Sequence, residues 1–76
     1  MDEKKKAKVI QIISDVIRTE SKLLHENSKM SDFAKWDSLA HLQIMFKIEK
    51  QFKKKVNTSK MGELNTVGKI LEFLKY

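Results

Sequence analysis

The chain has 76 residues, which is enough for one small domain over residues 1–76. It contains no cysteine, and this excludes a disulfide framework and a thiolate metal site. Hydrophobic residues make up 41% and charged residues 34%, the balance of a folded domain rather than of a disordered segment. The net charge of +6 suits anionic partners, such as nucleic acid, a membrane surface or an acidic protein.

The first residues, Met1 to Lys6, are mostly charged, and no apolar run of signal-peptide length follows them. No stretch approaches the roughly 20 apolar residues that a membrane-spanning helix needs. We therefore expect a cytoplasmic protein without a transmembrane segment, and we expect it to be a monomer.

Residues 3 to 20 have the apolar spacing of an amphipathic helix. Its apolar stripe consists of Val9, Ile12, Ile13, Val16 and Ile17. Residues 21 to 36 then lack a helical period, and we expect a long loop there, because loops of this length in compact domains are often functional. Four apolar side chains should attach this loop to the core: Leu23, Leu24, Met30 and Phe33.

A second helix is expected to begin at Asp37 and to end near residues 53 to 55, because aspartate is a favoured N-cap. One side of this helix is expected to be apolar, with Leu39, Leu42, Met45, Phe46 and Phe52, widened by Ile44 and Ile48. The other side is expected to carry Gln43, Lys47, Lys50 and Lys54. Such a division is that of a helix lying on a core.

Residues 56 to 65 read as a connector with one short helical turn, and a last helix should begin near Thr66 as its N-cap. The buried face of this helix is expected to hold Val67, Ile70, Leu71 and Leu74. The predicted fold is all-α: a small bundle of three main helices plus a short helical turn, with a long loop between the first and second helix.

Ser38 is the candidate functional residue. It would be the first residue inside the second helix, with Asp37 capping it and its hydroxyl pointing outward. A helix N-terminus favours a phosphate, because its free N–H groups and the helix dipole attract negative charge. The alternative interpretation is that a serine after a capping aspartate is merely part of the helix start.

The segment Asp37-Ser38-Leu39, followed by an amphipathic helix, resembles the prosthetic-group attachment motif of the acyl carrier proteins. The resemblance extends from Phe33 through Leu42 and Glu49 of the second helix to Thr66 and Leu74, so it covers about half the chain well. It implies a 4'-phosphopantetheine arm, derived from coenzyme A and attached to Ser38, with Asp37 and Leu39 beside it. The form of the motif with its preceding tryptophan, Trp36-Asp37-Ser38-Leu39, is similar to that of stand-alone carriers in specialised pathways.

The resemblance implies a non-catalytic protein that carries acyl groups as thioesters, in fatty acid biosynthesis or in a specialised lipid, polysaccharide or polyketide pathway. Its partners would be a phosphopantetheinyl transferase and acyl-handling enzymes. Three residues of the second helix would line an acyl pocket: Leu42, Phe46 and Ile48. We expect Trp36 to be an apolar anchor, or else a contact for the arm or for a partner enzyme. His41 is expected to be a partly exposed helix residue, or else a donor to the phosphate.

Most acyl carrier proteins are acidic on the second helix, whereas this chain presents Gln43, Lys47, Lys50 and Lys54 there. This face is either simply solvated, or a docking site for a partner with an acidic surface, or a contact for a membrane surface. The six lysines of residues 47 to 60 also allow an alternative function, a basic three-helix domain that binds nucleic acid. Arg18 is the only arginine, however, and no set of residues for base recognition is evident. Neither a metal-ligand cluster nor a catalytic constellation stands out.

Overall fold

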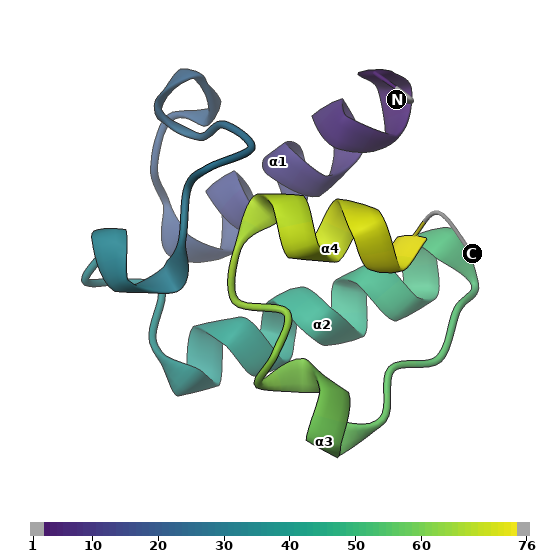
Figure 1. Cartoon of the computed structure of the whole chain (residues 1–76). Helices are drawn as coiled ribbons and strands as arrows, with labels where there is room; N and C mark the ends of the chain where they lie inside the picture. Colours follow the sequence, from purple (N-terminus) through teal and green to yellow (C-terminus); the bar gives the residue numbers. More distant parts are fainter. Residues whose placement is uncertain (1–2, 75–76) are drawn as a thin grey trace.

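The structure, a computed structural model, describes residues 3–74. Within this range the chain forms α-helices and two short 3-10 turns and no strand. The helices are α1 (Glu3–Ile17), α2 (Ser38–Phe52), α3 (Thr58–Met61) and α4 (Val67–Leu74), and the 3-10 turns are Ser21–Leu23 and Met30–Asp32. The predicted bundle of three main helices, one short helical turn and a long first connection is confirmed (Figure 1).

Helix α1 packs against both α2 and α4, and the three main helices enclose the core. Figure 1 shows α4 in front of α1 and above α2 in this view, with the short α3 at the bottom and the long loop on the left. The α4 face predicted to be buried is confirmed, with Val67, Ile70, Leu71 and Leu74 all buried. Residues far apart in the sequence, such as Val9, Ile48 and Ile70, therefore meet in one core cluster.

Two helices end in the same way, on a residue with left-handed backbone that is not a glycine. Helix α1 was expected to run to residue 20 but ends at Ile17, because Arg18 has φ 56° and the Thr19 N–H donates to the Ser14 carbonyl at 3.1 Å. Helix α2 ends as predicted, with Lys53 at φ 53°. A single left-handed residue of this kind stops the helix and satisfies its last carbonyl groups.

The long loop is bound to the start of α4 through its backbone. The N–H groups of Val67 and Gly68 donate to the carbonyls of Ser28 and Glu26 at 3.0 and 2.9 Å. Gly68 allows this close approach, because a Cβ at that position would lie 3.2 Å from the Glu26 carbonyl oxygen. The backbone of the loop is thereby held close to the core.

Side chains of the loop contribute unequally to the core. Leu24 is buried, and Met30 and Phe33 are half-buried against the core, as predicted. Leu23 is 53% exposed, so the prediction that it anchors the loop is wrong. It lies in a 3-10 turn that turns Leu24 inward, and neighbouring side chains of such a turn point to different sides.

The two short connections begin helices with polar caps. Asn57 Oδ1 accepts from the Lys60 N–H at 3.1 Å at the start of α3, and Thr66 Oγ1 accepts from the Lys69 N–H at 3.0 Å at the start of α4. The prediction that Thr66 caps the last helix is therefore confirmed. Each cap satisfies an N–H group that the first turn of a helix leaves free.

Replacing Arg18 tests whether its left-handed backbone stores strain. We expect Arg18→Gly to raise the free energy of unfolding by about 0.5–1 kcal/mol, because glycine adopts this backbone without a Cβ clash. Arg18→Val should lower it by about 1 kcal/mol, because a β-branched side chain disfavours this region further. Urea denaturation of both variants is the measurement. Both lose the guanidinium, so that loss cancels in their difference, and a more stable valine variant would contradict the assignment.

Candidate functional site

Ser38 is the first residue of α2 and is exposed. The preceding residue, Asp37, has extended backbone, and its Oδ1 accepts a hydrogen bond from the Ala40 N–H at 2.9 Å. The capping role predicted for Asp37 is thus confirmed. The N–H groups of Ser38 and Leu39 have no carbonyl acceptor within the helix, since they precede its first backbone hydrogen bond. A phosphate ester on Ser38 would add its negative charge at the positive end of the α2 dipole.

The residues of α2 that follow Ser38 leave an apolar strip in solvent. Leu39, Leu42 and Phe46 are 66%, 37% and 54% exposed. At spacings of three and four they lie on one side of the helix, and we call them the exposed apolar strip. The predicted apolar side is therefore wrong for these three residues, whereas Met45, Ile44 and Ile48, predicted with them, are buried. The helix also buries His41.

The three residues predicted to form an acyl pocket do not come together. Leu42 and Phe46 belong to the exposed apolar strip, whereas Ile48 is 1% exposed and lies in the core. Ile48 follows Phe46 by two positions, which places the two side chains on nearly opposite sides of a helix. The predicted pocket is therefore corrected to one core residue and two surface residues.

Three of the four residues predicted to form a partner face lie together on α2. Gln43, Lys47 and Lys50 are exposed, follow one another at spacings of four and three, and form what we call the basic strip. This strip borders the exposed apolar strip, because Gln43 follows Leu39 by four positions and Lys50 follows Phe46 by four. The surface beside Ser38 is therefore both apolar and positively charged.

The carboxylate of α2 is engaged with the backbone rather than with a lysine of the basic strip. Glu49 is the acidic residue of the helix, and its Oε2 accepts a hydrogen bond from the Val56 N–H at 2.7 Å. The carboxylate thus holds the start of the connection to α3. An acceptor engaged with backbone is less available to a basic partner.

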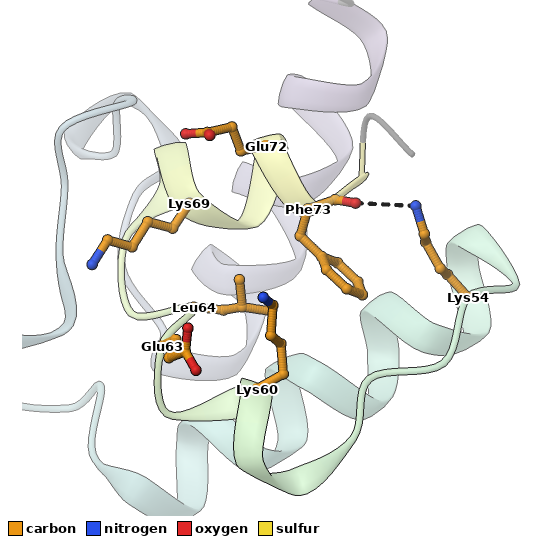
Figure 2. A pocket seen from close by; sticks show the side chains of 7 residues that line it. All are labelled: Lys54, Lys60, Glu63, Leu64, Lys69, Glu72 and Phe73. Atoms are coloured by element: carbon orange, nitrogen blue, oxygen red, sulfur yellow. Dashed lines mark hydrogen bonds between the residues drawn. The ribbon is translucent and has the colours of Figure 1, made fainter.

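Lys54, the fourth residue of the predicted partner face, lies elsewhere. Because Lys53 is left-handed, the chain leaves the axis of α2 before Lys54. The Lys54 ammonium donates to the Phe73 carbonyl at 3.0 Å and lies 5.1 Å from the centre of the Phe73 ring (Figure 2). This lysine therefore caps the C-terminal end of α4, where a positive charge is favourable, and does not extend the basic strip.

A shallow pocket lies beside this contact, between α3, α4 and the segment that carries Lys54. It is lined by Lys54, Lys60, Glu63, Leu64, Lys69, Glu72 and Phe73. In Figure 2 the charged side chains surround the pocket, and Leu64 and Phe73 supply its apolar part. None of the residues predicted for the acyl pocket is among them.

Two residues next to the attachment motif are joined by a hydrogen bond that the sequence did not predict. Trp36 is 2% exposed, which confirms it as an apolar anchor, and its Nε1–H donates to His41 Nδ1 at 3.0 Å. His41 is 6% exposed, and its Nε2 lies 2.8 Å from the Met61 carbonyl oxygen. The prediction that His41 is partly exposed is wrong, and both of its ring nitrogens are engaged away from Ser38. The sequence feature that could have indicated this hydrogen bond is a tryptophan just before the start of a helix and a histidine five positions later.

The family model for the phosphopantetheine attachment site matches residues 7–74. The chain belongs to this family of phosphopantetheine-binding carrier proteins. The match includes all four helices of the carrier except the first residues of α1, and it gives no support to a nucleic-acid-binding function. Comparison with curated proteins found no match.

The carrier's cofactor is a covalently attached 4'-phosphopantetheine group. Its family works with transferases and acyl-handling enzymes, and the acyl-carrier resemblance of residues 33 to 74 is thereby confirmed. The residues present fit the group, because an exposed hydroxyl lies at a helix start whose first N–H groups are free. Among residues 3–74, no helix is long and apolar enough to cross a membrane, and no three histidine or acidic side chains gather as metal ligands would.

Removing the cap should weaken the carrier at the start of α2. We expect Asp37→Ala to lower the free energy of unfolding by about 1 kcal/mol, because the Ala40 N–H loses its acceptor. Asp37→Asn should retain most of the stability, since asparagine caps about as well as aspartate. Urea denaturation followed by circular dichroism measures both. Equal losses in the two variants would show that charge rather than capping is what Asp37 contributes.

Proposed function

We propose that Ser38 is the attachment residue and that the protein is a non-catalytic carrier of acyl groups. The observation that carries this proposal is the position of Ser38, exposed at the first residue of α2 within the segment that matches the family. The pathway we propose is fatty acid biosynthesis or a specialised lipid, polysaccharide or polyketide pathway. The cytoplasmic location and the monomeric state stay predictions.

The attachment reaction needs little from the carrier itself. The Ser38 hydroxyl forms a phosphodiester with the phosphopantetheinyl phosphate of coenzyme A, while the bond to the adenosine bisphosphate breaks and the hydroxyl proton leaves. When bound, the arm supplies the thiol that this cysteine-free chain lacks, and acyl groups are carried on it as thioesters. The carrier contributes an ordered, solvent-facing hydroxyl and a helix start that tolerates the phosphate.

We further propose that enzymes acting on the arm dock on the exposed apolar strip and the basic strip of α2. Both strips start within the first two turns after Ser38, so an enzyme bound there is beside the attachment point. The charges of the basic strip are those of Lys47 and Lys50, and the Glu49 carboxylate is hydrogen-bonded to the Val56 N–H. Such a surface suits partners with an apolar centre and an acidic rim. Lys54 is left out, because it binds the end of α4.

The attachment residue is tested by mass. Incubation of the carrier with coenzyme A and a broad-specificity phosphopantetheinyl transferase should add one phosphopantetheine, and Ser38→Ala should abolish the gain. Ser31→Ala is the matched control, because Ser31 is an exposed serine in the loop before the motif and should leave the gain unchanged. Absence of a gain with several active transferases, or a gain that persists in Ser38→Ala, would refute the proposal.

The docking surface is tested by charge reversal. We expect Lys47→Glu combined with Lys50→Glu to lower kcat/KM for the native transferase by about tenfold at low salt, and by less at high salt, because opposite charges mainly speed encounter and salt screens them. Lys22→Glu combined with Lys69→Glu is the control: both side chains are exposed, neither lies on α2, and the change in net charge is the same.

Equal losses in the two double variants would contradict a specific docking surface.

The nucleic-acid alternative is tested by measuring the binding of duplex DNA. The unmodified carrier should bind duplex DNA only weakly and without sequence preference near physiological salt. Sequence-selective binding in the nanomolar range would overturn the carrier proposal.

A further inference from the structure

Three parts of the chain meet at the His41 side chain: the end of the long loop, the first turn of α2 and α3. Trp36 of the loop donates its indole N–H to Nδ1, and Nε2 faces the carbonyl of Met61 in α3. The side chains of all three residues are at least nine-tenths buried, at 2%, 6% and 8% exposure. The indole and imidazole rings also contact each other, with centroids 6.0 Å apart.

This geometry determines where the imidazole carries its proton. The indole N–H can only donate, so Nδ1 must accept and is unprotonated. The Met61 carbonyl oxygen can only accept, so Nε2 must carry the hydrogen and donate. His41 is therefore a neutral imidazole in one tautomer. A second proton, on Nδ1, would face the indole N–H donor to donor and break that hydrogen bond.

His41 also holds the backbone that precedes Ser38. Its own N–H donates to the Asp37 carbonyl at 2.8 Å, while its ring holds Trp36, the residue before Asp37. Trp36 is in turn linked to Phe33, by its N–H to the Phe33 carbonyl at 3.0 Å and by a ring contact. His41 thus holds the two residues before Ser38, Asp37 through its backbone N–H and Trp36 through its ring.

Charged groups near this junction do not replace these contacts. The segments that meet at His41 carry Lys35 and Asp37 before α2, and Lys60 and Glu63 around Met61, and all four are exposed. Glu49, the carboxylate of α2 itself, is bonded to the Val56 N–H. Because Trp36 and Met61 occupy both ring nitrogens, none of these carboxylates binds the imidazole to stabilise its charged form.

We propose that His41, as the neutral Nε2-protonated tautomer, is a positioning residue for the modification of Ser38. It ties the end of the loop to α3, so that Asp37 and Ser38 are presented in the capped helix start that an attacking transferase must recognise. The junction is consequently acid-sensitive, because protonation of the ring releases Trp36. This proposal rests on the proposed function of Ser38.

Three variants separate positioning from mere packing. His41→Gln keeps an acceptor for Trp36 and a donor for Met61 but cannot titrate near neutral pH. His41→Phe keeps the ring volume and loses both hydrogen bonds. Trp36→Phe removes the donor, so a proton on Nδ1 no longer meets a second donor.

The decisive measurement is kcat/KM for phosphopantetheine transfer from about pH 8 to about pH 5, the range over which imidazoles ordinarily titrate. At each pH the wild type is divided by His41→Gln, which cancels the pH dependence of the transferase. We expect a ratio near one at high pH that falls about threefold to tenfold at low pH, the scale of one lost buried hydrogen bond. The kcat/KM of Trp36→Phe, divided in the same way by that of His41→Gln, should change less between high and low pH. A flat wild-type ratio would overturn the proposal.

Two readouts need no modification of Ser38, so they distinguish a failure of the His41 proposal from a failure of the Ser38 assignment. ¹⁵N spectra of the histidine rings should show His41 unprotonated at Nδ1 and protonated at Nε2 at pH 8. The indole N–H of Trp36, the single tryptophan, should be protected from hydrogen exchange there and lose protection on acidification. The opposite tautomer, or unchanged protection at low pH, would refute the role of His41 even if Ser38 is modified. If no transferase modifies Ser38 while both readouts behave as expected, the proposed function fails instead. His41→Phe should lose indole protection at every pH, and if it does not fold, His41→Gln carries the test.

Discussion

The change from extended backbone at Asp37 to helix at Ser38 is the constraint on which the structure around the site depends. Asp37 caps the helix with its side chain, and His41, one turn later, holds Trp36 in the core. Because residues of a helix are related by a fixed rotation, the first residue determines which later residues face inward. A helix that starts at Ser38 and buries His41 must also bury Ile44, Met45 and Ile48, and it must leave Leu39 exposed.

Much of the fold and the start of the candidate site could be predicted because their signals are local. Asp37 and Thr66 are side chains that satisfy N–H groups only a few residues away, and both cap the helices they were expected to cap. The buried stripe of α4 was equally clear, since polar residues such as Lys69 and Glu72 separate its apolar ones. In such segments the sequence pattern admits one arrangement.

The orientation of α2 could not be predicted in this way, because apolar residues surround most of the helix. Leu39, Leu42 and Phe46 form one apolar side, and Ile44 and Ile48 form another, so periodicity alone does not choose between them. Which side faces the core is decided by a polar residue, His41. Burying its ring is favourable only because Trp36 of the loop and the Met61 carbonyl of α3 satisfy its two nitrogens, and neither partner is evident from the pattern of α2. The position of Lys54 was missed for a related reason. The end of α2 was predicted only to within residues 53 to 55, and Lys53 adopts the left-handed backbone that glycine usually signals, so the sequence did not show that Lys54 lies beyond the helix.

The apolar side chains that α2 leaves exposed contribute little to the stability of the fold. Burying a leucine or phenylalanine side chain contributes about 1.5–3 kcal/mol, a large share of the about 5–15 kcal/mol that stabilises a small domain. Leu39 and Phe46 contribute little of this, since both remain more than half exposed beside Ser38. Their apolar area is instead available to whatever binds α2. Glu49 turns its carboxylate to the Val56 N–H, so the charges that border this area are the ammonium groups of Lys47 and Lys50. The opposite side of α2 packs into the core together with α1 and α4, and this separation of faces leaves the side next to Ser38 in solvent.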